Sequence, residues 1–151
     1  MKKLFFAFAA FTLVLNSCSS DDDTTNTAQE VSNAVRVIFR AEFPNATDVE
    51  YTKVANDYEI DFKIADVDYK ALYKGDATFV KYKYDILSSE LPQTIITAVE
   101  TDFEDRKIDD TEILLIDGTN YYQLELENQP NDDQLVFNSD GALNASIYYW
   151  D

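Results

Sequence analysis

The side chains of this 151-residue chain that could do chemistry are carboxylates, lysines and a single cysteine, because the chain contains no histidine. Without histidine there is no Ser-His-Asp triad, no imidazole base and no His-containing metal site. Three glycines are too few for a phosphate-binding loop. Paired carboxylates can hydrolyse glycosides, but no pattern here places a buried acid beside a sugar-sized cleft. The sequence therefore predicts no catalytic residue, no enzyme activity and no cofactor.

Two stretches concentrate acidic side chains: residues 102–105 together with Asp109 and Asp110, and residues 131–133. Ca²⁺ takes about six to eight oxygen ligands in a defined loop, and neither stretch has the spacing of an EF-hand. We interpret both as ordinary loop and helix-end charges and predict no metal site, with a structural Ca²⁺ ion as the alternative.

The single cysteine, Cys18, stands at the end of an export signal. Lys2 and Lys3 precede an apolar run from Leu4 to Leu15, which is shorter than the roughly 20 residues that span a bilayer. The run closes in Leu15-Asn16-Ser17-Cys18, which resembles the lipobox of bacterial lipoproteins. The resemblance implies that residues 1–17 are removed as a signal peptide and that Cys18 is acylated on its sulfur and its amine, which would attach the protein to a membrane.

Residues 18–28 contain no large apolar side chain after the cysteine, so we expect a flexible acidic tether. Its beginning, Ser19-Ser20 followed by three Asp, resembles the signal that sends some Gram-negative lipoproteins to the outer face of the outer membrane. The alternative is a solvated spacer. We therefore expect a lipid-anchored protein of the cell envelope, in the outer membrane of a Gram-negative bacterium, with exposure at the cell surface if the signal interpretation holds.

Charge limits the partners. Removal of the signal takes away two Lys and no acidic residue, which changes the net charge from −17 to −19. Nucleic acid is bound through Lys and Arg, so no nucleic-acid partner is expected. The same charge argues against the domain itself lying on anionic lipid. The remaining length suits one domain with one core, which we assign to residues 29–151.

Two helices are predicted. Thr27-Ala28-Gln29-Glu30 has the form of a capping box, and apolar residues follow at helical spacing until Phe43-Pro44. A second helix is predicted to open at Leu91-Pro92, with Pro in its first turn. The predicted apolar sides of the two helices consist of Val31, Ala34, Val35, Ile38 and Phe39, and of Ile95, Ile96, Val99 and Phe103.

Strands are predicted where apolar and polar residues alternate, most strictly over residues 57–64. This period of two is typical of an antiparallel strand with one buried and one polar face. We expect Tyr82 and Tyr84 to pack in the core or across strands rather than to form a binding stripe. The other predicted strands are 68–74, 78–86, 112–116, 121–127, 134–138 and 142–150.

The two halves of the chain align at an offset of about 60–64 residues: Phe43 matches Phe103, and Tyr58–Phe62 matches Tyr122–Leu126. This self-similarity predicts an internal duplication. The expected fold is α+β: two tandem repeats, each a helix plus an antiparallel meander (about residues 29–86 and 91–150), form one sheet with the helices on one face.

A helix ending at Phe43-Pro44, a helix start at Leu91-Pro92 and a last turn at Asp140-Gly141 together resemble the PepSY-like family. That family is described as beta-lactamase-inhibitor-like, and its members are often small bacterial lipoproteins. The resemblance covers about residues 29–149. It implies two helices on one sheet face and leaves the other face open. In the beta-lactamase inhibitory proteins the open face holds the enzyme, but no inhibitory contact residue carries over by motif.

If Tyr58, Ile60 and Phe62 pack under the helices, the alternate residues must point to the open face. We predict there an acidic, partly aromatic platform for a basic or sugar-like partner, and we expect the partner to be an unknown protein or peptide. The alternative is a plain solvated sheet face. The candidate binding residues are Glu59, Asp61, Lys63, Tyr121, Gln123, Glu125 and Glu127, with Tyr148 and Trp150 as further aromatic members.

The expected function is an envelope-anchored binding module, and its sharpest form is an inhibitor of a peptidase or another hydrolase. The alternative is a structural or accessory component of an envelope complex without inhibitory action.

Overall fold

The computed structural model describes residues 31–104 and 106–151. Its seven strands form one antiparallel sheet in which each strand pairs with its neighbours in the sequence, in the order β1 to β7. The α+β class, the single antiparallel sheet and the two helices are thereby confirmed. The elements are α1 (Asn33–Glu42), β1 (Thr47–Val54), β2 (Asp57–Ile64), β3 (Val67–Tyr73), β4 (Phe79–Asp85), a short 3₁₀ helix (Ser88–Glu90), α2 (Gln93–Asp102), β5 (Ile108–Ile116), β6 (Thr119–Leu126) and β7 (Asp133–Asn138).

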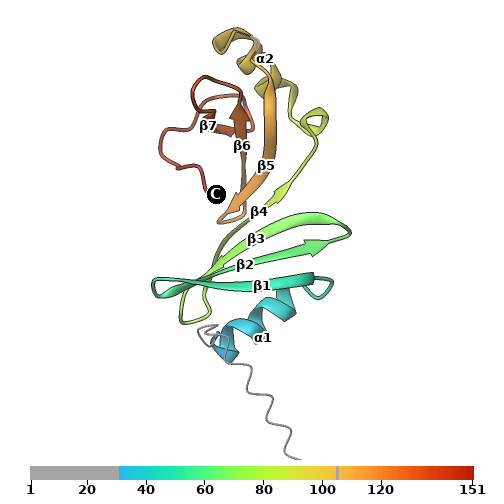
Figure 1. The fold of residues 1–151 in the computed structure, drawn as a ribbon, viewed down its shortest axis with the longest axis vertical. Helices are drawn as coiled ribbons and strands as arrows, with labels where there is room; N and C mark the ends of the chain where they lie inside the picture. Colours follow the sequence, from blue (N-terminus) through green and yellow to red (C-terminus); the bar gives the residue numbers. More distant parts are fainter. Residues whose placement is uncertain (1–30, 105) are drawn as a thin grey trace, which may run out of the picture.

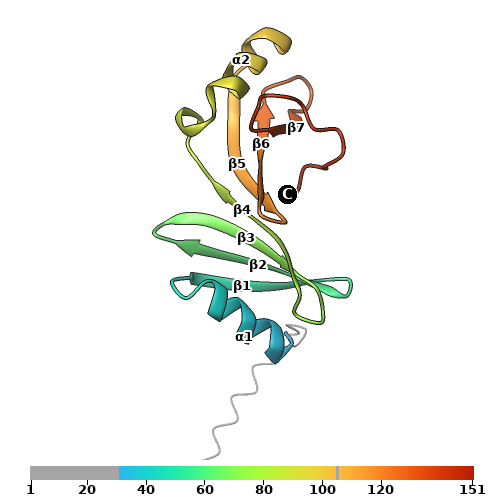
Figure 2. The same ribbon diagram turned by 180° about the vertical axis from the view of Figure 1, so that it is seen from behind.

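The sheet is strongly twisted along an elongated molecule (Figures 1 and 2). Strands β1 to β3 run across the long axis, β5 and β6 run along it, and β4 connects the two halves. α1 lies at one end and α2 at the other. Such a turn accumulates from the right-handed twist of each strand. Neither helix of the described residues is long and apolar enough to cross a membrane.

Both helices cover the same face of the sheet, as predicted. α1 packs Val35 and Phe39 onto Ile60, Phe62 and other residues of β2 and β3. α2 packs Ile95 and Val99 in the same way onto Leu124, Leu126 and Phe137. The strand register places both sets on one face, because the rows Ile60–Ala71–Tyr82 and Tyr84–Ile113–Tyr122–Phe137 meet at the two tyrosines of β4.

The tyrosines on that face pack with one another, as expected. Tyr69 and Tyr84 stack with ring centroids 5.1 Å apart, and Tyr82 lies 6.1 Å from Tyr84. Offset and tilted aromatic pairs at such distances stabilise a core beyond their buried area. The tyrosines connect the core under α1 to the middle of the sheet.

The first helix differs from its prediction. It begins at Asn33, after Ser32, so the buried Val31 precedes it. The predicted capping box, residues 27–30, lies outside the described residues. Ala34 and Ile38 are exposed, because the helix touches the sheet along the narrow line of Val35 and Phe39 and one flank therefore faces solvent.

Strand β1 was not predicted. It lies at the edge of the sheet and pairs only with β2. All of its residues except Tyr51 are exposed, so no burial alternation marks it in the sequence. Its register is also interrupted between Thr47 and Glu50, where Asp48 has a φ of 50°.

The predicted strand at residues 142–150 is wrong. Only Leu143 makes an isolated bridge to Phe137, and the Asn144 amide donates to the Val136 carbonyl. The chain then leaves β7 and runs along the side of the sheet away from the helices (Figure 1). Its last side chains pack on that face, and its backbone does not continue the strand pairing of β7 beyond the bridge at Leu143. The predicted internal duplication remains a prediction.

Candidate functional site on the second sheet face

The face of the sheet that α1 and α2 do not cover, here called the second face, carries alternating polar residues of β2 to β6. Across the central strands the register aligns Asp61, Lys70, Lys83, Leu114 and Tyr121 in one row. The adjacent rows contain Glu59, Lys63, Gln123 and Glu125. Every predicted binding residue within a strand therefore lies on this face. Glu127 follows the end of β6 and is exposed.

The C-terminal segment, residues 142–151, covers part of the second face, which we had expected to be open. The Trp150 indole N–H donates to Glu59 Oε1 at 3.0 Å. Its ring lies 4.0 Å from the Lys81 ammonium, a distance typical of cation–π contacts. The Gln123 amide exchanges two hydrogen bonds with the Trp150 backbone, at 3.1 and 3.0 Å. The prediction of an open platform is therefore wrong around Glu59 and Gln123.

Beneath this segment lies a buried polar network. Lys83 and Glu112 form an ion pair at 2.8 Å, and their side chains are only 9% and 7% exposed. The second oxygen of Glu112 accepts from the Gln123 side chain at 2.7 Å. Gln123 itself is completely buried. Because both Glu112 oxygens are used, the buried charges are satisfied, as stability requires.

Tyr149 lies over the same network. Burial raises the pKa of its hydroxyl above the usual range, and the charges of Glu112 and Glu125 add to the shift. The Lys83 ammonium lies 5.9 Å from its ring. Tyr149 is therefore packed against the sheet, whereas Tyr148, which we had placed on the binding face, points into solvent and is 86% exposed.

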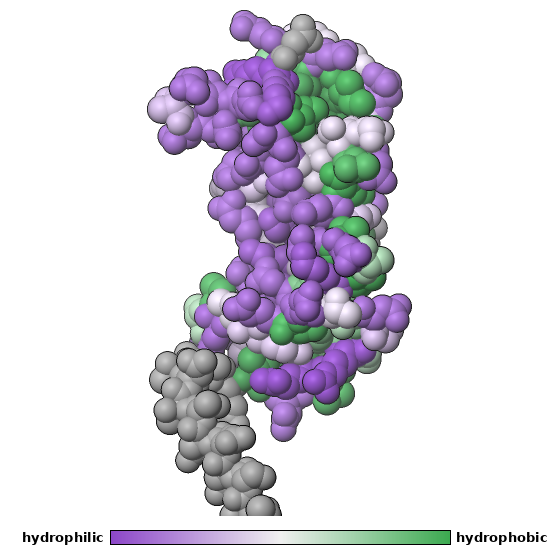
Figure 3. All heavy atoms as spheres, turned by 45° about the vertical axis from the view of Figure 1, so that its right-hand side comes forward, coloured by the Kyte–Doolittle hydropathy of each residue, from purple (hydrophilic) through white to green (hydrophobic). Residues whose placement is uncertain are grey.

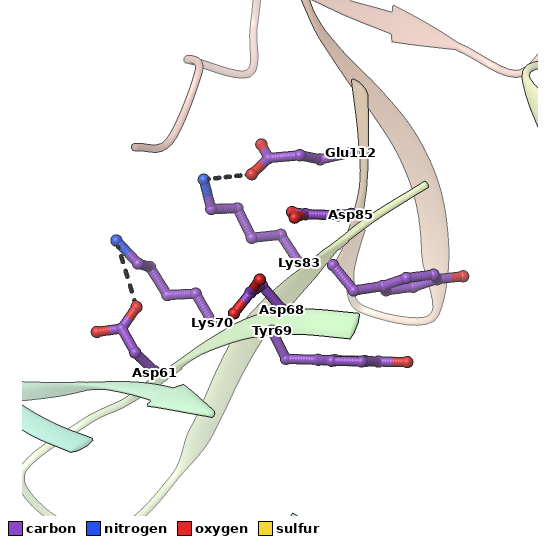
Figure 4. Close-up of a pocket in the computed structure, with 8 residues that line it drawn as sticks. Asp61, Asp68, Tyr69, Lys70, Lys83, Asp85 and Glu112 are labelled. Atoms are coloured by element: carbon purple, nitrogen blue, oxygen red, sulfur yellow. Dashed lines mark ion pairs between the residues drawn. The ribbon is translucent and has the colours of Figure 1, made fainter. Parts of the chain in front are cut away.

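A pocket of about 150 Å³ opens on the second face beside the C-terminal segment (Figure 4). Two ion pairs cross it, Lys83 with Glu112 and Lys70 with Asp61 at 3.7 Å. Its charged lining consists of four carboxylates and two ammonium groups, namely Asp61, Asp68, Asp85, Glu112, Lys70 and Lys83. The pocket thus has an excess of two negative charges.

Asp85 is the carboxylate without a counter-charge. Asp68 pairs with Lys63 at 2.8 Å, whereas Asp85 forms no ion pair with any residue in the described ranges 31–104 and 106–151. Asp85 is exposed at the end of β4, but the protein atoms around its carboxyl partly desolvate that group and raise its pKa above the usual range. The neighbouring charges of Asp110 and Glu112 raise it further, and Lys83 opposes them only in part. The charged form of Asp85 is therefore less favourable than that of a fully solvated aspartate.

The other predicted residues are mostly occupied by contacts within the chain. Glu125 accepts from Gln134 at 2.9 Å, and Glu127 pairs with Lys107. Of the predicted binding set, only Asp61 lines the pocket. Tyr121 is half-buried on the second face.

Sequence reasoning missed Asp85, Lys83 and Glu112 as site residues. The alternation of β4 already placed Lys83 and Asp85 on the polar face, opposite the tyrosines. No pattern indicated that Glu112 of the next strand lies directly across from Asp85. A signal that could have helped is the position of these charges in the central strand of the sheet, where exposed polar residues have neighbours on both sides.

The acidic stretches also have local roles. Asp133 pairs with Arg106, and hydrogen bonds from Arg106 and Asn128 lower the pKa of its carboxyl. Within the described part of the chain, no three His, Cys, Asp or Glu residues are grouped as a metal site.

Comparison with known proteins shows which solved structures share this fold. No family model and no curated protein sequence matches the chain, so the PepSY-like resemblance remains a prediction. Solved structures do match. A BLIP-like protein of Bacteroides fragilis has a TM-score of 0.68 at 22% identity, over 86% of this chain and 98% of that one.

The chain has a BLIP-like fold. A second match is a DUF2874 family protein of Bacteroides uniformis, with a TM-score of 0.70 at 18% identity over 76% of this chain and 86% of that one. A third is a Bacteroides eggerthii protein whose description predicts a periplasmic location, with a TM-score of 0.70 at 16% identity and the same coverage. At these identities the likeness shows the BLIP-like fold alone.

Proposed function

We propose that this chain is an envelope-anchored protein-binding module whose second sheet face receives a Lys or Arg side chain of its partner. The observation that carries the proposal is the pocket lined by four carboxylates and two lysines. One of the four carboxylates, Asp85, has no ion pair with another described residue. An arriving cation would supply the counter-charge at Asp85 and complete the set of ion pairs.

The physical reason is that Asp85 is already partly desolvated and repelled by its neighbours. A group whose charged form is disfavoured in the free state gains more from a cation than a fully solvated carboxylate does. Perturbed carboxylates of this kind are typical of functional sites. The pocket is too small for a folded segment but suits a single side chain.

The BLIP-like fold supports a protein as the partner, and the sharpest form of the proposal is an inhibitor of a peptidase or another hydrolase. The alternative is a non-inhibitory accessory component of an envelope complex. The lipobox-like ending at Cys18 and the periplasmic description of one structural neighbour support an envelope location. Residues 1–30 lie outside the described residues, so the signal, the acylated cysteine and the tether are part of the proposal.

We also propose that the two halves of the chain arose by internal duplication. Tyr58 pairs with Tyr73 across β2 and β3, and Tyr122 pairs with Phe137 across β6 and β7. Each residue of the second pair follows its counterpart in the first pair by 64 residues, which agrees with the offset found in the sequence. The missing counterpart of β4 is the segment that covers the second face.

The pocket can be tested without knowing the partner. A titration of the ¹⁵N-labelled soluble domain with acetyl-arginine methylamide should shift the amide signals of Asp68, Asp85 and Glu112. The neutral citrulline analogue should not shift them. Binding should strengthen as the pH rises through the raised pKa of Asp85, because the ionised carboxylate is the form that attracts the cation.

The matched control compares Asp85→Asn with Asp117→Asn, which removes an exposed charge in the turn between β5 and β6. Asp85→Asn should abolish the shifts, and Asp117→Asn should leave them intact. Equal shifts with the citrulline analogue, or unchanged shifts in Asp85→Asn, would show that the pocket does not recognise a cation.

A further inference from the structure

A second cavity lies between α1 and the edge strand β1, on the helix-covered side of the sheet. Its volume is about 550 Å³, compared with about 150 Å³ for the acidic pocket. Phe39, which is 1% exposed, forms the floor. Phe43 of the α1 end and Tyr51 and Val49 of β1 line the sides. We call this cavity the α1–β1 groove.

The charge of the α1–β1 groove is opposite to that of the rest of the chain. Arg36 and Arg40 line it, and none of its lining residues is acidic, although the chain has 29 acidic and only 12 basic residues. The Arg36 guanidinium lies 4.9 Å from the Tyr51 ring centroid. Neither arginine forms an ion pair with any residue from 31 to 151 that the structure describes.

The wall formed by β1 is an unpaired strand edge. β1 pairs only with β2, and from Glu50 to Val54 that pairing is regular. Such an edge presents backbone N–H and C=O groups that an extended peptide can satisfy. Tyr51 and Lys53 are partners of Ile60 and Tyr58 and therefore lie on the helix-covered side, toward the groove. Lys53 does not itself line the groove.

We propose that the α1–β1 groove binds an extended peptide segment that carries both acidic and apolar residues on one strand face, at every second position, and that adds to β1 as an eighth strand along Glu50–Val54. Its apolar side chains would pack against Phe43 and Tyr51, and its carboxylates would meet Arg36 and Arg40. Arginine is well suited to this role, because its planar guanidinium binds carboxylates with two parallel hydrogen bonds. The site is separate from the acidic pocket, which selects cations on the opposite face.

The strand edge is the reason to prefer a peptide to a lipid headgroup. A phosphate would use the arginines but neither the free backbone groups of β1 nor the aromatic floor. An anionic membrane surface is therefore treated as an outcome that the experiment must separate.

The probe is a fluorescein-labelled peptide, acetyl-Glu-Thr-Phe-Thr-Glu-Thr-amide, whose Glu and Phe side chains share one face of a strand, and the protein is the soluble domain, residues 24–151. Fluorescence anisotropy should show saturable binding, and the peptide with Lys in place of each Glu should not bind. Arg36→Gln with Arg40→Gln should weaken binding about tenfold or more. Lys74→Gln with Lys107→Gln removes the same charge outside the groove and should change binding less than about twofold, as expected for screened surface charges.

Backbone pairing is checked by amide hydrogen exchange, which should slow for residues 50–54 when the peptide is bound, while circular dichroism shows that both variants are folded. Phosphatidylglycerol vesicles form the second arm, with phosphatidylcholine vesicles as the control. Absence of peptide binding, or equal loss in both double variants, would overturn the proposal. Vesicle binding that needs Arg36 and Arg40, without peptide binding, would assign the groove to a membrane surface instead.

Discussion

At the scale of single residues, the second face contains two kinds of acid. Glu112 is buried and satisfied by Lys83 and Gln123, so it belongs to the structure. Asp85 lies on the neighbouring strand, directly across from Glu112, but lacks a counter-charge among the described residues. The sequence could predict which face both occupy, because strand alternation decides that. It could not predict their ionisation or pairing, because these depend on side chains brought in by other strands and by the C-terminal segment.

The buried pair gives a stability prediction. Glu112→Gln should lower the free energy of unfolding by about 3–5 kcal/mol, because the Lys83 ammonium is left buried without its carboxylate. Lys83→Met together with Glu112→Gln should be less destabilised than Glu112→Gln alone, since no unpaired charge remains. Urea denaturation of both variants measures this. A double variant less stable than the single one would contradict the assigned pair.

Asp85 gives a pH-dependent prediction. Its raised pKa means that the ionised carboxylate is less favourable in the folded chain than in the unfolded chain. The charge therefore lowers stability at pH values above the folded-state pKa. This loss disappears as the pH falls through that pKa toward the unfolded value of about 3.9. Asp85→Asn should accordingly be more stable than the wild type at neutral pH, and the difference should shrink on acidification.

Denaturant midpoints of Asp85→Asn and the wild type, compared at several pH values, test this prediction, with Asp117→Asn as the control. A variant that gains stability and loses cation binding would identify Asp85 as a residue kept for function at a cost in stability. A difference that grows as the pH falls would show the opposite sign of linkage.

At the scale of elements, the outcome of each prediction followed burial. Residues 57–64 form β2 with the predicted bounds, because one face is covered and the other is not, which produces strict alternation. β1 escaped prediction because all of its residues except Tyr51 are exposed, so no pattern of burial marks the strand. Residues 142–150 alternate like a strand, yet Tyr149 and Trp150 pack onto the second face instead of extending β7. The local sequence pattern could not distinguish a strand that is hydrogen-bonded within the sheet from a segment whose side chains pack on the face of the sheet.

The sheet faces give the next prediction. Phe62 and Leu126 are 2% and 0% exposed in the two cores, so Phe62→Ala should cost about 3–5 kcal/mol and Leu126→Ala about 2–5 kcal/mol. Glu125→Ala, one residue away on the second face, should stay within about 0.5 kcal/mol of the wild type. Denaturant midpoints provide the comparison. A Glu125→Ala variant as unstable as Leu126→Ala would reverse the assigned faces.

At the scale of the whole molecule, the acidic pocket opens on the second face, whereas the α1–β1 groove lies between α1 and the edge strand β1. Both belong to an elongated molecule in which α1 lies at one end (Figure 1). In one side view, hydrophilic residues cover most of the surface and hydrophobic residues form separate patches (Figure 3). The high negative charge would speed association with a basic partner and repel anionic surfaces. The composition alone predicted this preference. It could not predict the basic groove, which appears only when α1 and β1 lie side by side.

The anchor is tested in the full chain. Cys18→Ala should abolish metabolic labelling with a clickable palmitate analogue and leave the protein unprocessed or released from membranes, because the thiol that would carry the lipid is absent. Membrane fractionation with in-gel fluorescence measures both effects. Equal labelling of the wild type and the variant would show that Cys18 does not carry the lipid.

The central claim, that the second face contacts a protein partner through Asp85, is tested most directly by photo-crosslinking in the living cell. A photoreactive benzoylphenylalanine replaces Asp68 at the pocket rim or, as the control, Glu100 on the exposed side of α2. We expect irradiation to yield a discrete protein adduct from position 68 and none from position 100. Adding Asp85→Asn should remove the adduct from position 68. Adducts of equal yield from both positions, or an adduct at position 68 that Asp85→Asn leaves unchanged, would contradict the account.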